Sequence, residues 1–271
     1  MEIKYCKTNP TGNITLIVET PVLRESQAAV AAYLMSLDKD AEQVGFIESP
    51  ENPDCALRLQ MMGGEFCGNA SISAAALYFS KSAPSPADKS VVCIEVSGAG
   101  KPLDVSVEYT GGNTFCGSVS MPLPESVSDC ELCYNGKSYT LPLVRMPGIC
   151  HAIVKDSSVL PFAGDAIAEW CRQLDAEALG LMFYNAAEGL LEPLVYVEST
   201  GSTVWESSCA SGSCAVSVYE SLRGGVSGVL SLRQPGGALN VKSSCEGGKL
   251  QNITLTGNAD IIGYSSAVID T

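Results

Sequence analysis

The chain has 271 residues, 46% of them hydrophobic and 17% charged. Such a composition is typical of an ordered globular protein with room for about two domains. Thirty acidic residues against 16 basic ones give a net charge of −14, so neither nucleic acid nor an anionic membrane surface is an expected partner. The first residues, MEIKYCKTN, lack the apolar stretch of a signal peptide, and no run of 18 apolar residues follows, so we expect a cytoplasmic protein.

The chain contains 12 cysteines and a single histidine, His151. In a reducing compartment the cysteines are expected to be thiols, core residues, metal ligands or nucleophiles rather than disulfides. One histidine is too few for a zinc-protease helix or a His-rich metal centre. There is no phosphate-binding loop that ends in Lys-Ser or Lys-Thr and no dinucleotide fingerprint, so no nucleotide cofactor is expected.

Short runs of apolar and β-branched residues predict strands, which in chain order cover residues 14–19, 56–61, 91–96, 103–109, 118–121, 152–155, 194–198 and 229–233. Four Ala- and Leu-rich stretches predict helices at 26–38, 68–82, 165–178 and 210–222. Many short strands, few helices and frequent Gly and Pro turns indicate an α+β fold, in which helices pack against curled, mostly antiparallel sheets.

A weak internal repeat divides the chain in two. Pro10-Thr11-Gly12 leads into one strand and Pro147-Gly148 into another, and each half later reaches a cysteine that opens a helix. We therefore expect two pseudo-symmetric lobes, residues 1–124 with Cys67 and residues 125–271 with Cys209, which meet in the Pro- and Ser-rich stretch 121–126. The last dozen residues either stay in the second lobe or return as a strand to the first.

Cys67 and Cys209 each stand just before small residues, at the expected start of a helix. The first turn of a helix exposes unpaired N–H groups and a partial positive charge, so a thiol there has a pKa of roughly 3.5–7.5 instead of about 8.5. Two such sulfurs on opposite faces of a small molecule suit stereoinversion, in which a thiolate removes an α-hydrogen and a thiol returns one. The alternative is that both cysteines are buried small hydrophobic residues.

The two cysteine segments resemble those of the diaminopimelate epimerase superfamily of cofactor-independent amino-acid racemases. More closely, five blocks in order resemble the histidine racemases of staphylopine-type metallophore synthesis: NPTGNITLIV (9–18), EQVGFIES (42–49), GGEFCGNASIS (63–73), VWESSCASGS (204–213) and QPGG (234–237). The resemblance covers most of the chain. It implies a diaminopimelate epimerase-like fold with a central helix in each lobe, and a reaction that uses neither a cofactor nor a metal.

The resemblance also implies roles for individual residues. Cys67 and Cys209 are the acid/base pair, and Asn13 contacts the substrate. Backbone groups of Gly68-Asn69 and Ala210-Ser211 bind the substrate carboxylate, although Ala210 stands where the superfamily usually has Gly. The pocket for the substrate side chain is implied to include Glu42 and Gln43 together with Glu206; the residues alone favour a solvated turn for Glu42.

One departure from the superfamily bears on the substrate. Diaminopimelate epimerases bind the distal carboxylate of their substrate with an Arg shortly before the second cysteine, whereas no Lys or Arg occurs here from Gln173 to Leu222. A second anionic group on the substrate would therefore lack a partner, which disfavours diaminopimelate. Glu206, three residues before Cys209, suits a substrate side chain that donates hydrogen bonds or carries positive charge.

Four other signals carry less weight. Cys130 and Cys133 form a lone Cys-x-x-Cys pair, which we interpret as part of a surface hairpin. Cys214 points away from the face of Cys209 on the same helix and is expected in the core. For His151 a structural hydrogen bond is the expected role. Trp170 and Trp205 are interpreted as packing residues.

These observations predict a pyridoxal-independent racemase that interconverts L- and D-histidine by two-base proton transfer, with a link to opine metallophore synthesis. Its partner is the amino acid, and a homodimer is compatible with the sequence. A nearer alternative is a racemase or epimerase of lysine, ornithine, arginine or diaminopimelate. An alternative of another class is a non-catalytic, cysteine-rich protein that binds zinc or senses oxidants.

Overall fold

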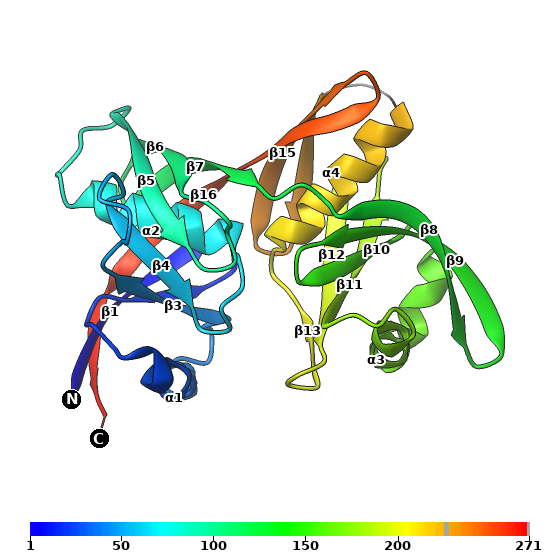
Figure 1. Cartoon of the computed structure of the whole chain (residues 1–271), viewed down its shortest axis with the longest axis horizontal. Coiled ribbons are helices and arrows are strands. Elements are labelled where there is room, and N and C mark those ends of the chain that lie inside the picture. The colour runs from blue at the N-terminus through cyan, green and yellow to red at the C-terminus, as the bar shows by residue number, and fades with distance from the viewer. Residues whose placement is uncertain (225–227, 270–271) are drawn as a thin grey trace. The chain divides into compact units, whose positions relative to one another are not determined.

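The structure, a computed structural model, describes residues 1–224 and 228–269 (Figure 1). The chain forms two compact units: unit 1 comprises Met1–Ser120 and the chain from Thr256 onward, and unit 2 comprises Met121–Leu255. The predicted second lobe includes residues 225–227 and 270–271, which lie outside the described residues. Within the described ranges, none of the helices combines the length and apolar character that a membrane crossing requires.

The sheet of unit 1 closes on itself. Its strands follow one another in the order β1 (Glu2–Pro10), β2 (Thr15–Val18), β3 (Gln43–Glu48), β4 (Leu57–Met61), β5 (Lys89–Val96), β6 (Leu103–Gly111), β7 (Thr114–Met121) and β16 (Lys249–Val268), and β16 pairs with β1. The β2–β3 and β4–β5 pairs are parallel, whereas β1–β2, β3–β4, β5–β6, β6–β7 and β1–β16 are antiparallel. Such closure leaves few unpaired strand edges.

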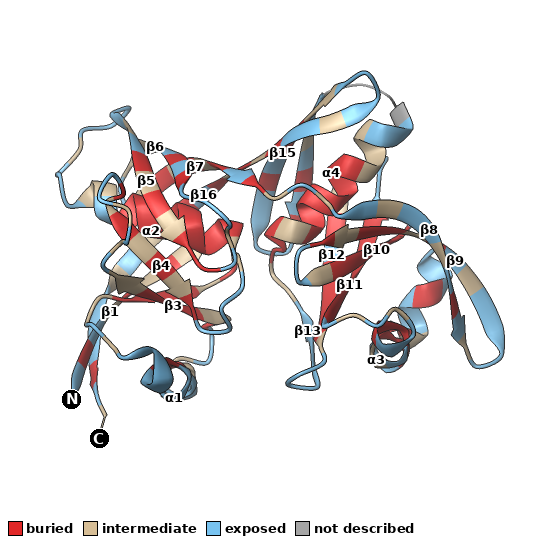
Figure 2. Ribbon diagram, viewed as in Figure 1, coloured by how far each residue is buried: buried red, intermediate tan, exposed pale blue. Residues whose placement is uncertain are grey.

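Helix α2 (Gly68–Ser80) is the central helix of unit 1. Every residue from Gly68 to Leu77 is buried, and the helix contacts β1, β2, β5 and β6 (Figure 2). A helix that is buried on all sides must be apolar or small all round, and the sequence GNASISAAAL meets this requirement. The helix also supplies the crossover that the parallel strands β4 and β5 need.

Helix α1 (Arg24–Leu37) lies on the other side of the unit 1 sheet. Its apolar residues Val30, Ala31 and Leu34 pack with side chains of β1, β2 and β3. Because β2 is covered by α2 on one face and by this cluster on the other, all four of its residues are buried. The strand therefore reads as a continuous apolar run instead of an alternating one.

Unit 2 contains the rest of the strands, which belong to the same 16-stranded sheet as those of unit 1. Its strands are β8 (Ser126–Tyr134), β9 (Lys137–Met146), β10 (Ile149–Val154), β11 (Ala178–Asn185), β12 (Leu190–Val197), β13 (Ser202–Trp205), β14 (Gly228–Gln234), β15 (Gly237–Glu246) and the first part of β16. The order along the sheet is β16-β15-β14-β12-β11-β10-β9-β8, and β13 pairs with β12. The predicted surface hairpin is present, because Cys130 and Cys133 lie on β8, which pairs with β9.

Helices α4, η1 and α3 flank this part of the sheet. Helix α4 (Ala210–Gly224) contacts β9, β10, β11, β14 and β15, and its first turns are buried (Figure 2). The short helix η1 (Ser157–Phe162) and α3 (Ala163–Gln173) pack against β8, β11 and β12. Trp170 of α3 is fully buried among aromatic rings and donates its indole N–H to the Cys133 carbonyl at 3.1 Å, in agreement with a packing role.

The two units repeat one sequence of strand pairings. In unit 1 the pairs from β1 to β6 are antiparallel, parallel, antiparallel, parallel and antiparallel. In unit 2 the pairs β9–β10, β10–β11, β11–β12, β12–β14 and β14–β15 follow the same order. In each unit the first parallel pair is joined through the outer helix and the second through the helix that a cysteine precedes.

The four predicted helices are present, with one clear difference at an end. The helix predicted at 165–178 ends at Gln173, because Asp175 adopts the left-handed conformation with φ of +49° and the Ala176 N–H donates back to the Cys171 carbonyl at 3.2 Å. Such a turn terminates a helix. The residues from Ala178 onward belong to β11.

Gly117 of β7 faces Ile72 of α2 and leaves no room for a side chain of its own. A Cβ atom at this position would collide with the Ile72 side chain of α2, so we expect Gly117→Ala to lower the free energy of unfolding by about 1–3 kcal/mol. Gly100→Ala in the same unit is the matched control, because a Cβ there meets nothing within 4 Å. Chemical denaturation monitored by circular dichroism measures both variants; equal stability of the two would contradict this account of the packing.

Candidate functional site

Cys67 caps the N-terminus of α2. Its backbone is extended, with φ of −129° and ψ of 113°, and its Sγ accepts a hydrogen bond from the Ala70 N–H at 3.4 Å. The Ser71 hydroxyl donates to the Cys67 carbonyl at 2.7 Å, which fixes the other side of the residue. The half-buried sulfur is therefore held where the first turn of the helix presents its unpaired N–H groups.

The loop before Cys67 is tied down by Ser97, at the end of β5. Its hydroxyl accepts the Met61 N–H at 2.9 Å and donates to the Glu65 carbonyl at 2.8 Å. Gly98 follows with φ of +71°, and a Cβ atom there would lie 2.5 Å from the Phe66 nitrogen. Close contact with the Phe66 backbone thus requires glycine at position 98.

Four predicted site residues of unit 1 form one hydrogen-bonded chain. Asn13 lies in the β1–β2 turn and donates its amide to the Glu42 carboxylate at 2.5 Å. The Asn13 oxygen accepts from Gln43 at 2.6 Å and from Asn69 of α2 at 3.5 Å. Glu42 and Gln43 reach this place because β3 runs parallel to β2, next to Thr15. Glu42 is half-buried, so it is not the solvated turn residue that the residues alone favoured.

Cys209 occupies the matching position before α4. The Gly212 N–H hydrogen-bonds to its sulfur, and the Ser213 hydroxyl donates to its carbonyl at 2.7 Å. Both cysteines thus accept from the residue three positions later, and a serine four positions later binds each carbonyl. The sequences Cys-Gly-Asn-Ala-Ser and Cys-Ala-Ser-Gly-Ser carry this repeat, although the two serines were not singled out from the sequence.

The expectation of an acidic thiol at a helix N-terminus is wrong for Cys209. Burial raises the pKa of this thiol well above its ordinary value, and the charge of Glu206, which also hydrogen-bonds the thiol, raises the pKa further. The Ser211 hydroxyl and the Gly212 N–H act in the opposite direction and are outweighed. Cys209 therefore holds its proton in this form of the protein.

Ser211 connects Cys209 to the single histidine. Its hydroxyl lies 3.6 Å from the Cys209 sulfur and 3.0 Å from His151 Nε2. Burial lowers the pKa of His151 to about 3, so the imidazole is neutral. Within the described residues its Nδ1 atom has no hydrogen-bond partner. The hydrogen bond to Ser211 agrees with the predicted structural role of His151. The Ser211 hydroxyl is the group that connects the imidazole of His151 to the Cys209 sulfur.

Gln234 completes a closed ring of hydrogen bonds around Cys209, and sequence reasoning did not assign it a role. Its Oε1 accepts the Cys209 N–H at 2.8 Å, and its Nε2 donates to the Ser213 hydroxyl at 3.0 Å. Because the Ser213 hydroxyl donates to the Cys209 carbonyl, both backbone polar groups of Cys209 are fixed. All three residues are buried, where an unpaired polar group would be costly. The signal was the QPGG block, which begins at Gln234.

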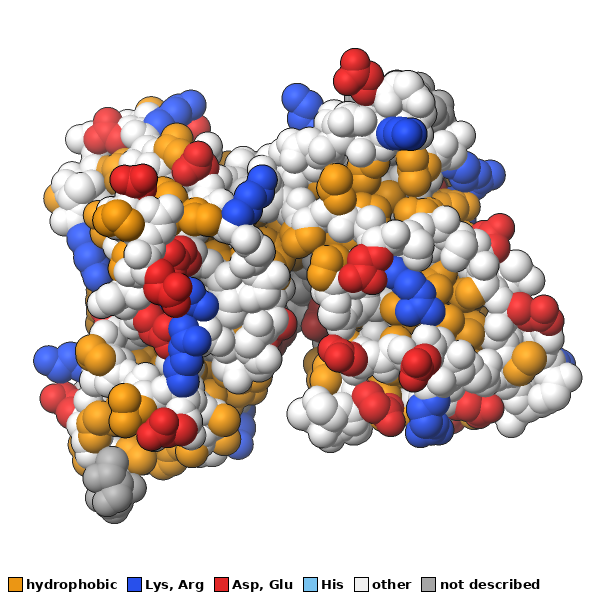
Figure 3. All heavy atoms as spheres, in the orientation of Figure 1, with side chains coloured by type: hydrophobic (Ala, Val, Ile, Leu, Met, Phe, Trp, Pro, Cys, Tyr) orange, Lys and Arg blue, Asp and Glu red, His pale blue; other side chains and the backbone are white. Residues whose placement is uncertain are grey.

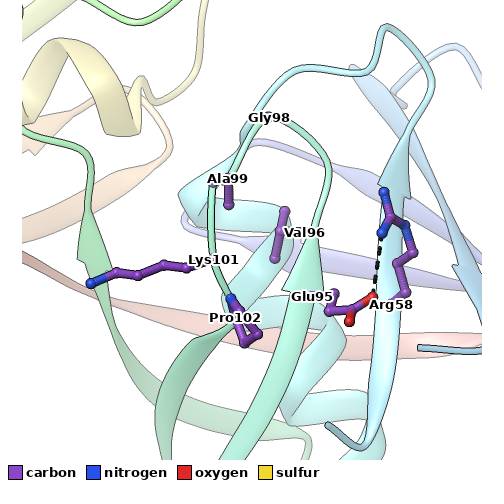
Figure 4. A pocket seen from close by; sticks show the side chains of 8 residues that line it. Arg58, Glu95, Val96, Gly98, Ala99, Lys101 and Pro102 are labelled. Atoms are coloured by element: carbon purple, nitrogen blue, oxygen red, sulfur yellow. Dashed lines mark hydrogen bonds and ion pairs between the residues drawn. The ribbon is translucent and has the colours of Figure 1, made fainter. Parts of the chain in front are cut away.

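The structure thus gathers the predicted residues into two sets. Unit 1 holds Cys67, Gly68 and Asn69 with the Asn13 chain of hydrogen bonds, and unit 2 holds Glu206, Cys209, Ala210 and Ser211. A pocket in unit 1 lined by Arg58, Glu95 and the loop 98–102 contains none of them (Figure 4). Among the described residues, no three His, Cys, Asp or Glu side chains come together as metal ligands would.

The fold is shared with racemases, epimerases and proteins of the PhzF family. A probable proline racemase from Agrobacterium radiobacter aligns over 99% of this chain and 93% of its own, with a TM-score of 0.74 and 16% identity. A PhzF-family phenazine biosynthesis protein from Bacillus anthracis aligns with a TM-score of 0.72 and 14% identity, over 99% of this chain and all of its own. At such identities the likeness defines the class of fold alone.

The sequence defines the family. The model of the histidine racemase CntK N-terminal domain matches residues 2–267, so the chain belongs to this family. A histidine racemase of Fusobacterium nucleatum is 34% identical over 226 residues, which is 80% of each chain. A histidine racemase of Staphylococcus aureus is 26% identical over 248 residues, 89% of this chain and 88% of the relative. The resemblance seen in the five sequence blocks is confirmed.

The environment of Cys209 gives a prediction for thiol reactivity. Replacing Glu206 by Gln removes a negative charge that raises the pKa of the Cys209 thiol, so alkylation of Cys209 is expected to reach half-maximal rate at a lower pH. Iodoacetamide labelling across a pH series, read by peptide mass spectrometry, measures the shift. Glu188→Gln, at an exposed position of the same unit, is the control. An unchanged or higher midpoint in Glu206→Gln would contradict the assignment.

Proposed function

We propose that the protein is a pyridoxal-independent histidine racemase in which Cys67 and Cys209 exchange protons with the α-carbon. The observation that carries the proposal is the paired arrangement of the two cysteines, each capping a central helix in a member of the histidine racemase family. The diaminopimelate epimerase-like pair of lobes is part of the proposal, the first lobe with Cys67 and the last C-terminal strand and the second with Cys209. Membership of a family whose relatives are named histidine racemase supports histidine as the substrate.

In the proposed reaction one sulfur acts as a thiolate and removes the α-hydrogen from one face of the amino acid. The other sulfur acts as a thiol and delivers a proton to the opposite face, so the configuration inverts. Cys209 holds its proton in the form described here, which makes it the donor in the turnover that starts from this form. After that turnover Cys209 is the thiolate and is ready for the reverse direction.

The charge that develops on the substrate needs stabilisation by the protein. The N-terminal turns of α2 and α4 present backbone N–H groups at Gly68-Asn69 and Ala210-Ser211, and such oriented amides stabilise a carboxylate whose negative charge grows as the carbanion forms. When Cys209 is a thiolate, the Ser211 hydroxyl can donate to its sulfur while His151, neutral and buried, holds that hydroxyl in place. These groups offset part of the cost of a buried thiolate.

The side-chain pocket is proposed to involve the carboxylates of Glu42 and Glu206. Asn13 holds the Glu42 carboxylate, and the Cys209 thiol hydrogen-bonds Glu206. A protonated imidazole donates a hydrogen bond from each ring nitrogen, so two carboxylates suit an imidazolium side chain. A link between Glu206 and Cys209 would also let the charge of the bound side chain influence the thiol.

A cytoplasmic location, a homodimer and a role in opine metallophore synthesis remain predictions.

The proposed activity is tested with purified protein, a panel of L-amino acids and chiral chromatography. We expect D-histidine to form from L-histidine, with solvent deuterium in the α-position of the product. Cys67→Ser and Cys209→Ser are each expected to lower kcat by roughly 10²-fold or more, because serine is a far weaker acid and base at neutral pH. Cys133→Ser, at an exposed position, is the control. Turnover retained in both single variants, or racemisation of lysine, ornithine or arginine but not histidine, would overturn the proposal.

The hydrogen-bonded ring around Cys209 gives a second prediction. In Gln234→Glu a carboxylate replaces the amide that binds the Cys209 N–H and Ser213, and the added negative charge disfavours the thiolate. In the direction in which Cys209 acts as the thiolate, we expect a lower kcat and a shift of the rising limb of the pH–rate profile to higher pH. Gln251→Glu adds the same charge at an exposed site of the same unit. A lower kcat with an unshifted profile would show that Gln234 only supports the local fold.

A further inference from the structure

Two cysteines of unit 1 lie in contact outside the proposed site. Cys55 lies two residues before β4, Cys93 lies in β5, and their Sγ atoms are 2.8 Å apart. The Ala56 N–H donates to the Cys93 carbonyl at 2.8 Å, so the two backbones are joined next to the sulfurs. Both residues are free thiols, and their sulfurs are about 0.8 Å farther apart than the roughly 2.0 Å of a disulfide bond.

The loop that carries Cys55 is anchored on the strand that carries Cys93. The Glu95 carboxylate, two residues after Cys93, accepts the backbone N–H groups of Glu51 and Asn52 at 3.0 and 2.7 Å. Arg58 of β4 donates to the same carboxylate at 3.3 Å, as the dashed line in Figure 4 marks. Acidic and basic side chains also interleave on this part of unit 1 in Figure 3. Small side-chain adjustments would therefore suffice to bring the sulfurs into bonding distance.

The two thiols differ in exposure. Cys55 is buried, and this burial together with its hydrogen bond to Cys93 raises the pKa of the Cys55 thiol to about 12, so Cys55 keeps its proton. Cys93 is half-buried and shares the outer face of β5 with Val91, which is 63% exposed, because side chains alternate along a strand. A small oxidant from solvent therefore meets Cys93 first.

We propose that Cys55 and Cys93 are a redox modification site, at which a peroxide forms a reversible disulfide. The Cys93 thiolate attacks hydrogen peroxide to give Cys93 sulfenic acid and hydroxide. The Cys55 sulfur then attacks the sulfenic sulfur and passes its proton to the departing hydroxide, so that the S–S bond forms, the S–O bond breaks and water leaves. The two thiols together lose two electrons, and the peroxide is reduced to two molecules of water. A dithiol reductant reverses the reaction through a mixed disulfide.

The bond would close a ring that contains β4, Cys67 and α2. Cross-linking across such a ring restricts the unfolded chain and stabilises the unit that contains it. The site does not include the residues proposed to contact histidine, and its test does not depend on racemase activity. The disulfide would therefore protect the unit that holds Cys67 under oxidising conditions without using Cys67 itself.

The test uses the full chain and hydrogen peroxide at a few equivalents, followed by alkylation of the remaining thiols and digestion without reductant. We expect a Cys55–Cys93 linked peptide that disappears on treatment with dithiothreitol, and a higher Tm of the oxidised protein. Cys55→Ser and Cys93→Ser should abolish the linked peptide, whereas Cys116→Ser, a half-buried strand cysteine of the same unit, should retain it.

The wild-type peptide map alone decides the matter if a variant fails to fold. Full alkylation of Cys55 and Cys93 at a dose that has consumed the exposed Cys133 would overturn the proposal. Conversion of Cys93 to a sulfinic acid without a linked peptide would overturn it as well, because Cys55 would then not act as the resolving thiol. Loss of racemase activity through oxidation of Cys67 or Cys209 would leave the mapped result unaffected.

Discussion

The N-terminus of a helix enclosed by a sheet needs partners for its unpaired N–H groups, and in both units of this protein a cysteine sulfur supplies one. Cys67 accepts from Ala70, and Cys209 accepts from Gly212. In each unit the serine four residues later donates its hydroxyl to the cysteine carbonyl and so helps to fix the same turn. The same N–H groups that a fold must satisfy are those that a bound carboxylate would use. Structure and proposed chemistry therefore depend on one local interaction, repeated once.

Local features of the fold could be predicted from the sequence because they depend on neighbouring residues. The Ala- and Ser-rich segments after Cys67 and Cys209 define helices whatever the rest of the chain does, and the four helices are present. Strand β1 was not predicted, because Lys, Thr, Asn and Glu interrupt its apolar pattern, and β3 was not, because Gly45 interrupts a short apolar run. Their pairing partners, which lie far away in the sequence, decide that these segments are extended.

The properties of the candidate site show the same limit. The sequence places Glu206 three residues before Cys209, but it does not show that the thiol is buried, and burial outweighs the helix N-terminus in setting its pKa. Likewise, Glu42 and Asn13 lie 29 residues apart in the chain, and only the parallel pairing of β2 with β3 brings them together. The role of Gln234 could be predicted only with the knowledge that β14 ends beside the start of α4. Features that depend on burial or on long-range contacts were therefore not predicted from the sequence, whereas local features were.

The last strand has a consequence for synthesis of the protein. Strand β16 closes the sheet of unit 1 by pairing with β1, so that Glu2 lies opposite Val268. A nascent chain emerges from the ribosome with its N-terminus first, and the strand that closes the sheet of unit 1 is made only after the rest of unit 2. Unit 1, although encoded first, can reach its native state only after translation of unit 2 is complete. Until then β1 and β7 each have a free edge, and such edges can pair with other chains.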